Sequence, residues 1–487
     1  MLTFHPFFRN ELTITKIQEA MDQRLITSKE LVMFYMKQIA SLDQSGPALN
    51  SILEINPEAI FIAEALDEER KRAGKRSDLH GIPILLKDNI ETGDFMRTSA
   101  GTLALQYNRS TEDAYLVKKL RHSGAVILGK TNMTELSNGM SSTMWAGYSA
   151  KGGQVLHPYG DPEMFVGGSS SGSAVAVAAN LTVLAVGTET DASILSPAVQ
   201  NSVVGIKPTI GLISRSGIIP FTYTQDTAGS FARTVKDAAI LLEALVGVDE
   251  EDPSTYKRRE KSVGSYVDEL NEEALNGARI GIFTNGPASF YQSGEYDEVL
   301  FFQVVQDIKD AGSMVIEGVD IPSFHRKWSD AVLRYELRHS LDNYLQTLPA
   351  HAPVHTVNEL IKFNEKYAET ALKYGQNKLE ERSEQQSSLR SADYIHAKLD
   401  DLYYAQEEGI DYTLKKYGLD AIVFPAYLNS TISAKAGYPS IAVPAGYQAS
   451  GRPFGITFAG GAFSEKKLIQ LAYAFEQKTK HRKSPRF

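Results

Sequence analysis

Apolar residues recur along this chain in two patterns, the short continuous runs typical of buried strands and the three-to-four spacing of helices. The clearest case is residues 174–186 (AVAVAANLTVLAV), a stretch too short to cross a bilayer and interrupted by Asn180. It predicts a helix of small residues, a turn near Asn180 and a buried strand over residues 181–186. Ser169 would then lie just before the helix and Ser193 just beyond the strand, in loops of the kind that carry the chemistry of α/β proteins.

A second unit of this kind precedes the first. An apolar run at residues 82–86 ends at Lys87, and residues 114–120 place their apolar side chains on one helical face. Gly124 ends that helix, and residues 125–128 predict the next strand. Strand, helix and strand in this order are typical of a largely parallel sheet with helices on both sides.

The N-terminal part is predicted to be helical. Thr15 with Gln18, and Thr27 with Glu30, each have the spacing of a capping box, in which side chains satisfy free N–H groups of the first helical turn. We therefore expect two helices to begin near these threonines.

The second half of the chain returns to strands after a helical region. Residues 249–276 are charged and poorly periodic, which favours an exposed connection. Residues 323–418 are rich in Glu, Lys, Gln and Tyr, and they predict a helical layer that covers the sheet and contributes to substrate contacts. The other predicted elements are strands at 278–283, 420–425, 440–443 and 455–458, a helix at 298–310, and a final helix with Leu468, Leu471, Ala472 and Phe475 on one face.

These patterns together predict the α/β class, with an α/β/α sandwich built on a large mixed, mostly parallel central sheet covered by helices. No internal repeat is evident, and we expect one catalytic domain over residues 1–487. Its expected parts are N-terminal helices at 1–60, a core with the catalytic motifs at 61–284, a mainly helical substrate-covering region at 285–418, and a return to the sheet with a C-terminal helix at 419–487.

Composition and charge exclude several classes of function. A chain of 487 residues with 43% hydrophobic residues can bury a large core. The net charge of −9 and the lack of a basic run give no electrostatic reason to expect nucleic acid or an anionic membrane as partner. The absence of cysteine excludes disulfides, thiolate metal sites and a cysteine nucleophile. The first residues lack the pattern of a signal peptide, so a cytoplasmic location is expected.

Lys87 is a candidate base because it ends a buried strand. Burial disfavours the charged ammonium form and lowers the pKa of a lysine. A base role requires such a shift, since at the ordinary pKa of about 10.4 only around one lysine in a thousand is neutral near pH 7.4. The alternative is a lysine paired with Asp88 at a strand end.

Two serine-bearing loops are candidates for the nucleophile. The run GGSSSGS at residues 167–173 leads into the predicted helix, whose first N–H groups can orient a hydroxyl. It contains a formal G-x-S-x-G around Ser170, but the turn-rich residues before it lack the strand that a nucleophile elbow requires. The run TETDAS at residues 188–193 ends the predicted strand, and its alternative is a turn in which Ser193 or Ser196 only satisfies backbone groups.

Taken in order, Lys87, GGSSSGSA and TETDASI…P closely resemble the motifs of the amidase signature family. The resemblance extends over most of the chain, least clearly through residues 285–420, and several ordered motifs are far more specific than any one alone. Further matches are GKTNMTEL (129–136), GIKPTIGLISRSGIIP (205–220), QDTAGSFART (225–234) and GYPSIAVPAGY (437–447).

The resemblance implies the amidase signature fold and a Ser–Ser–Lys triad. By position in the motifs, Ser193 corresponds to the nucleophile, Ser169 to the bridging serine that follows a cis peptide in the family, and Lys87 to the base. Ser170 becomes a neighbouring structural or hydrogen-bonding residue. The backbone N–H groups expected to stabilise the oxyanion are those of Thr190, Asp191, Ala192 and Ser193.

The chain departs from the family pattern at Ala192, where most members carry glycine. If this position needs a positive φ, alanine is strained by roughly 1–2 kcal/mol. Alanine keeps its N–H group, so the oxyanion site would be weakened at worst unless the methyl group blocks the substrate.

The function implied is hydrolysis of a small or peptide-like amide through a seryl acyl-enzyme, without cofactor or metal, as in peptide-amidase-type members. One alternative is the glutaminase subunit of a tRNA-dependent amidotransferase, although Leu195 stands where those subunits carry arginine. A second is a catalytically weak binding homologue, because of Ala192. A third is a Ser–His–Asp esterase that uses a histidine such as His339 or His355. A homo-oligomer is left open, and His351 with His355 is interpreted as a surface pair without a third metal ligand.

Overall fold

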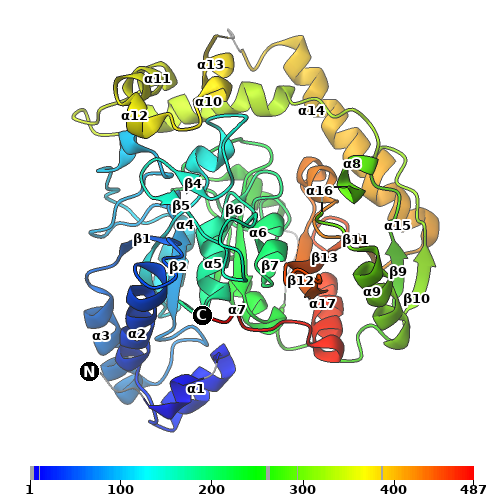
Figure 1. Cartoon of the computed structure of the whole chain (residues 1–487), viewed down its shortest axis with the longest axis horizontal. Coiled ribbons are helices and arrows are strands. Elements are labelled where there is room, and N and C mark those ends of the chain that lie inside the picture. Colours follow the sequence, from blue (N-terminus) through cyan, green and yellow to red (C-terminus); the bar gives the residue numbers. More distant parts are fainter. Residues whose placement is uncertain (1–4, 10, 259–263, 293, 385–387) are drawn as a thin grey trace.

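A computed structural model describes residues 5–9, 11–258, 264–292, 294–384 and 388–487. Within these residues the chain folds around an eleven-stranded mixed sheet flanked by helices (Figure 1). In order across the sheet the strands are β1 (Ile52–Ile55), β3 (Val126–Thr131), β2 (Pro83–Lys87), β6 (Leu184–Glu189), β8 (Thr227–Ala232), β7 (Val204–Lys207), β12 (Ser440–Tyr447), β13 (Pro453–Ala459), β11 (Ala421–Pro425), β9 (Arg279–Ile282) and β10 (Met314–Glu317). A separate two-stranded ribbon joins β4 (Tyr148–Ser149) and β5 (Gly153–Gln154).

The predicted α/β class with a large mixed sheet is confirmed, but the expectation that the sheet is mostly parallel is wrong. Strands β3, β2 and β6 are parallel neighbours, as are β11, β9 and β10. All pairs from β6 through β8, β7, β12 and β13 to β11 are antiparallel. The reason is connectivity, since β12 and β13 are consecutive strands joined by a short turn and no crossover helix separates β7 from β8.

Helices cover both the sheet and its upper edge. In Figure 1, α10 to α14 run along the top of the molecule, and α1 to α3 lie at the lower left. The described part of residues 323–418 is mainly helical, as predicted, and its contribution to substrate contacts stays a prediction. The helices are α1 (Ile14–Asp22), α2 (Ser28–Gln38), α3 (Ala59–Ala73), α4 (Tyr115–His122), α5 (Ser171–Ala178), α6 (Leu195–Gln200), α7 (Val235–Leu245), α8 (Ala288–Tyr291), α9 (Glu298–Asp310), α10 (Ala331–Gln346), α11 (Val357–Lys366), α12 (Ala368–Ala371), α13 (Asn377–Glu384), α14 (Ala392–Ala405), α15 (Asp411–Tyr417), α16 (Ser430–Ala436) and α17 (Glu465–Thr479).

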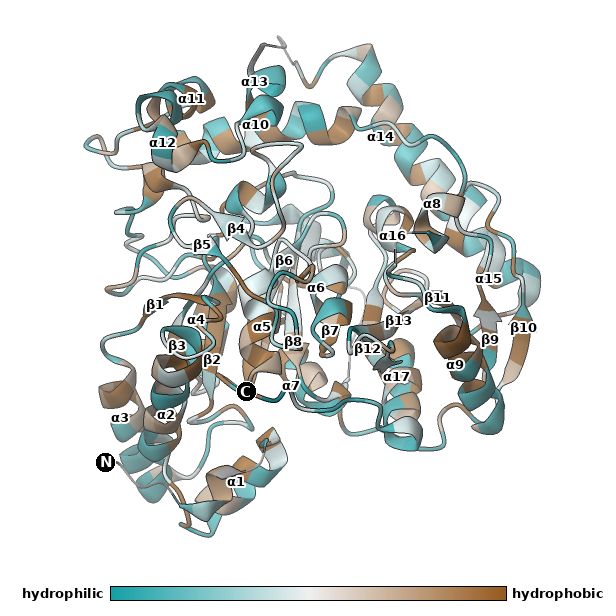
Figure 2. Cartoon of the chain, in the orientation of Figure 1, coloured by the Kyte–Doolittle hydropathy of each residue, from teal (hydrophilic) through white to brown (hydrophobic). Residues whose placement is uncertain are grey.

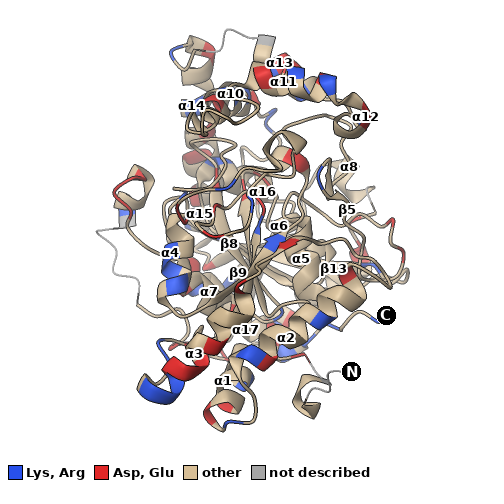
Figure 3. Ribbon diagram, turned by 90° about the vertical axis from the view of Figure 1, so that its left-hand side faces the viewer, with Lys and Arg blue, Asp and Glu red and all other residues tan. Residues whose placement is uncertain are grey.

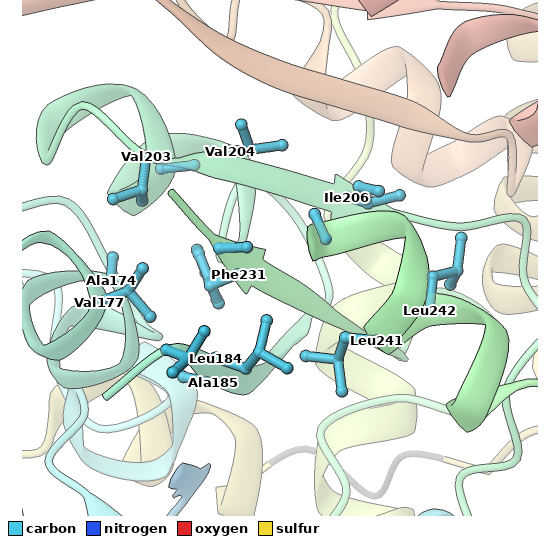
Figure 4. Close-up of a cluster of buried hydrophobic side chains, with 14 of the residues drawn as sticks. Ala174, Val177, Leu184, Ala185, Val203, Val204, Ile206, Phe231, Leu241 and Leu242 are labelled. Carbon is cyan, nitrogen blue, oxygen red and sulfur yellow. The ribbon is translucent and has the colours of Figure 1, made fainter. Parts of the chain in front are cut away.

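The core lies between the central strands and the helices packed on them. Figure 4 shows Phe231 of β8 among side chains of α5, β6, β7 and α7. Hydrophilic residues gather on outer helices such as α10, α13 and α14, while central strands such as β6 and β8 are pale (Figure 2). Charged residues gather on outer helices such as α3 and α4, and α5 carries none (Figure 3). No helix in the described part of the chain is long and apolar enough to cross a membrane.

Most predicted elements occur, with shifts that have local causes. The helix at 298–310 is α9, and the strand at 278–283 is β9. The strand predicted from residue 181 begins at Leu184, because Asn180 has a left-handed φ of 55° and the chain needs the next residues to complete the turn. The short edge strand β10 was not predicted. The connection at 249–276 is only partly exposed, since Asp252, Thr255 and Tyr266 are buried; its residues 259–263 lie outside the described residues.

One of the two predicted capping boxes is present. Thr27 caps α2: its hydroxyl accepts from Glu30 N at 3.1 Å, and the Glu30 carboxylate accepts from Thr27 N at 2.8 Å. The box predicted at Thr15 and Gln18 is wrong, because α1 begins two residues earlier than a cap at Thr15 would require, and its cap is Thr13. The Gln18 side chain instead points inward and donates to carbonyl oxygens of residues 78 and 80.

These two threonines provide a matched test of the helix starts. We expect Thr27→Ala to lower the free energy of unfolding by about 1 kcal/mol, because it leaves first-turn N–H groups of α2 without a cap. Thr15→Ala, inside α1, should change it by less than about 0.5 kcal/mol. Urea unfolding of both variants measures the difference, and equal losses would contradict the assignment of the caps.

Candidate active site

Lys87 ends β2 with its side chain fully buried. Its Nζ lies 2.7 Å from Ser169 Oγ, 3.1 Å from the carbonyl oxygen of Thr188 and 2.9 Å from Thr188 Oγ1. Burial lowers the pKa of this amine to about 7, although the negative charges of Asp226 and Glu189 act in the opposite direction.

The alternative in which Lys87 pairs with Asp88 is not what the structure shows. The Asp88 carboxylate accepts from the Ser99 hydroxyl and from Gly101 N, and it lies 3.7 Å from the amine of Lys151. The two neighbouring charged side chains therefore serve different partners, and the Lys87 amine faces neutral oxygen atoms.

The GGSSSGS loop brings Ser169 to the lysine and fixes Ser170 on the end of β6. The peptide bond between Gly168 and Ser169 is cis, and α5 begins two residues after it. Ser170 Oγ donates to the carbonyl oxygen of Thr188 at 3.0 Å and accepts from its N–H at 3.2 Å. Gly187 permits this approach, because a Cβ there would lie 2.7 Å from Ser170 Oγ. Since the Ser170 hydroxyl is engaged by backbone and no strand ends directly before the loop, the nucleophile-elbow pattern has no structural support.

Ser193 lies in the next loop, directly beside the first. Its carbonyl oxygen accepts from Ser170 N at 3.2 Å, so one backbone hydrogen bond joins the two serine loops. Its hydroxyl lies 3.5 Å from the Asp191 carbonyl oxygen, a weak contact at most, which leaves Oγ available to a substrate. Ala192 has a φ of 63°, which confirms that the position before Ser193 needs the left-handed conformation.

Three carboxylates hold the loop that carries Ser193, and the sequence patterns predicted such a role for none of them. Glu189 accepts from Ile194 N at 2.6 Å and from Leu195 N at 3.0 Å. Asp226 accepts from the Thr190 hydroxyl at 2.6 Å, and Asp191 accepts from the Thr431 hydroxyl at 2.9 Å. Burial raises the pKa of all three carboxyl groups. Asp226 lies within the QDTAGSFART match, so this motif was the only signal for it.

A cavity of about 370 Å³ opens beside the Thr188 and Thr190 end of β6. Its wall combines polar groups near Lys87 with an apolar segment of the loop between β7 and β8. The polar part of the wall includes Asn89, Thr188, Thr190 and Asp226, and the segment between β7 and β8 contributes residues 218–223. This is a space in which a small organic molecule could lie next to the serine loops.

The described residues give no support to a histidine or a metal at this site. His339 lies on α10 and pairs with the hydroxyl of Tyr223, and His355 precedes α11. Neither is a hydrogen-bond partner of Ser193. Among the residues that the structure describes, no group of three or more potential ligands could hold a metal ion.

Comparison with known proteins connects this arrangement to one family. Residues 30–469 match the Amidase family. The chain is 39% identical over 498 residues to a probable amidase of Arabidopsis thaliana, covering 99% of this chain and 92% of the relative. It is 30% identical over 505 residues to a glutamyl-tRNA(Gln) amidotransferase subunit from Halorhodospira halophila, covering 96% of this chain and 98% of that relative.

Among solved structures, the native peptide amidase of Stenotrophomonas maltophilia matches with a TM-score of 0.92 and 41% identity, covering 99% of this chain and 100% of the other. The family match, the whole-chain sequence similarity and the similarity to a solved structure therefore agree. The chain belongs to the amidase family.

Proposed function

We propose that the chain hydrolyses the carbon–nitrogen bond of a small or peptide-like amide through a seryl acyl-enzyme, with Ser193 as nucleophile, Ser169 as relay and Lys87 as base. The observation that carries the proposal is the fully buried Lys87 amine 2.7 Å from Ser169 Oγ. The similarity to a peptide amidase supports a peptide-like amide as substrate.

The hydrogen-bond partners of Lys87 suit a neutral amine. Such an amine has two N–H donors and one lone pair, whereas an ammonium group has three donors and no acceptor. The carbonyl oxygen and Oγ1 of Thr188 can receive the two N–H groups. The lone pair is then directed at the Ser169 hydroxyl, which can donate to it. No carboxylate occupies any of the three positions, so no direct ion pair holds the amine in its charged form.

The proton can then move along one line. As Ser193 Oγ attacks the amide carbonyl carbon, Ser169 takes the proton of Ser193 and passes its own to Lys87. The carbonyl oxygen becomes an oxyanion, which backbone N–H groups of residues 190–193 stabilise, each such donor being worth about 3 kcal/mol. The proton returns through Ser169 to the leaving nitrogen, the C–N bond breaks, and water hydrolyses the seryl ester.

A glutaminase subunit is the second candidate, because relatives of that kind cover nearly the whole chain. Two features favour the first candidate. Identity to the peptide amidase is 41%, against 30% to the amidotransferase subunit. Leu195 also stands where the family pattern of those subunits has arginine. Glutamine-specific ammonia release would reverse this preference.

The triad is tested by removing each polar group while keeping the site filled. We expect Lys87→Met, Ser169→Ala and Ser193→Ala each to lower amide turnover by roughly 10³-fold, the scale of lost nucleophilic and acid–base catalysis. Turnover is measured as ammonia or amine release from primary carboxamides, C-terminal peptide amides, anilides and glutamine. Ser170→Ala, which removes the hydroxyl of the residue next to Ser169, is the control variant for these three.

Labelling with a fluorophosphonate probe separates the enzyme from a silent binding homologue. Wild-type protein should be labelled and Ser193→Ala should not. Lys87→Met with most of its turnover retained, or labelling that survives in Ser193→Ala, would refute the assigned roles.

The pH dependence follows from the pKa of Lys87. Below a pH of about 7 the amine takes up a proton and can no longer act as base, so kcat/KM should fall with decreasing pH around that value. The negative charge of Asp226 raises this pKa. Asp226→Asn should therefore move the midpoint to lower pH, whereas Asp393→Asn, on the exposed start of α14, should leave it in place. A shift to higher pH in Asp226→Asn would contradict the electrostatic argument.

The strained backbone of Ala192 raises the question of whether this residue lowers the amidase activity. With a φ of 63°, Ala192→Gly relieves strain, and we expect it to raise the free energy of unfolding by about 1 kcal/mol and to preserve or raise turnover. Ala198→Gly, in helix α6, should lower the free energy of unfolding by about 1 kcal/mol or more. Thermal unfolding and ammonia release measure the two effects, and a large loss of turnover in Ala192→Gly would show that alanine is required there.

A further inference from the structure

Helix α10 presents a row of polar side chains to the wall of the cavity. Glu336, His339, Ser340 and Asn343 have the spacing of one helical face, and each contacts the loop segment at residues 221–224. This segment precedes β8 and contributes Phe221, Thr222 and Tyr223 to the cavity lining. One face of α10 therefore contacts a segment that forms part of the cavity wall, next to Thr188 and Thr190 in the run that ends at Ser193.

The buried part of this contact fixes the backbone of the segment. Glu336, fully buried, accepts from Thr224 N at 3.0 Å and from the Thr224 hydroxyl at 2.9 Å. Ser340 Oγ donates to the carbonyl oxygen of Phe221 at 2.9 Å. The other oxygen of Glu336 accepts from the hydroxyl of Tyr394 on α14 at 2.6 Å, which ties a second helix to the same point.

The exposed part of the contact holds one aromatic ring. Asn343 Nδ2 donates to the Tyr223 hydroxyl at 2.7 Å, and that hydroxyl lies 3.1 Å from His339 Nδ1. The rings of Tyr223 and His339 pack edge to face with centroids 5.7 Å apart. Polar contacts at an exposed position add little to stability, so these two side chains mainly determine where the Tyr223 ring lies.

The same segment is connected to the nucleophile loop at its other side. Asp226 accepts from Phe221 N at 2.7 Å and Thr222 N at 2.9 Å, and the same carboxylate holds the Thr190 hydroxyl. The wall thus has two attachments, one to the residues around Ser193 and one to α10. Asp226 holds only backbone N–H groups of the segment, whereas the Tyr223 side chain contacts Asn343 and His339, so the position of its ring depends chiefly on α10.

We propose that α10 is a specificity-determining element, and that Tyr223, positioned by Asn343 and His339, binds an apolar substituent on the acyl part of the amide. The inference rests on the proposed function and names its substrate class. The apolar surface of Ile218, Ile219, Pro220 and Phe221 next to Tyr223 is what such a substituent would contact. In a primary amide this substituent belongs to the acyl part, since the leaving group is ammonia.

Two primary amides that differ in this substituent test the proposal: propionamide and N-acetyl-L-phenylalaninamide. In Asn343→Ala the ratio of the KM for the aromatic amide to the KM for propionamide should rise about fivefold, the effect of one net hydrogen bond. The change should lie in KM more than in kcat. Tyr223→Phe, which keeps the ring and removes the hydroxyl, should give a similar ratio, and the double variant should give no further increase.

Gln346→Ala is the matched control, because Gln346 is an exposed residue of α10 that does not line the cavity. An unchanged KM ratio in Asn343→Ala, an equal rise in Gln346→Ala, or effects that add in the double variant would each overturn the proposal. These comparisons require that the wild-type protein hydrolyses the amides and that Ser193→Ala abolishes this hydrolysis. If the wild type turns over neither amide nor any other amide of the panel, the proposed function itself fails and the inference falls with it.

Discussion

The proposed site depends on the burial of the Lys87 amine without a carboxylate bonded to it. A lysine in water is almost entirely an ammonium ion at neutral pH, and burial is what makes the neutral form accessible. A carboxylate bonded to Lys87 would cancel this effect. The nearest candidate in the sequence, Asp88, accepts from Ser99 and Gly101 instead. The two carboxylates whose charges act on the amine, Glu189 and Asp226, accept hydrogen bonds from loop backbone. Their negative charges raise the pKa of Lys87, which burial lowers to about 7, although neither carboxylate is bonded to the amine.

The positions of Lys87 and the two serine loops follow from a short parallel part of a largely antiparallel sheet. Strands β2 and β6 are parallel neighbours with Leu86 opposite Val186, so Lys87 and Thr188 emerge at the same edge. The helix–strand unit from α5 to β6 then brings its two ends, the loops of Ser169 and Ser193, to that edge. This explains why two loops distant in sequence from Lys87 lie at the same edge of the sheet without a long excursion of the chain.

Strands β2, β3, β6, β9, β11, β12 and β13 were predictable from sequence, whereas β7 and β8, in the middle of the antiparallel part, and the edge strand β10 were not. Apolar runs with helical spacing between them identified β2, β3 and the unit from α5 to β6. Apart from Phe231, strand β8 (TAGSFA) consists of small and polar residues. Glycine is needed at position 229, because a Cβ there would lie 2.1 Å from the Ile206 oxygen of β7. Such a strand has no hydrophobic pattern to read. Similarly, ordered motifs predicted Lys87, Ser169 and Ser193, while the anchors Glu189 and Asp226 depend on contacts that only the folded chain creates.

The left-handed Ala192 shows how such anchors act. A non-glycine residue in this conformation persists only where its surroundings over-determine it. Here the Glu189 carboxylate holds the two N–H groups that follow Ser193, Asp226 holds Thr190, and Ser196 N donates to the carbonyl oxygen of Ala192 at 2.8 Å. The loop is therefore fixed on both sides of the strained residue. Because these contacts do not involve the Ala192 side chain, the methyl group costs conformational energy while the direction of the neighbouring N–H groups is set elsewhere.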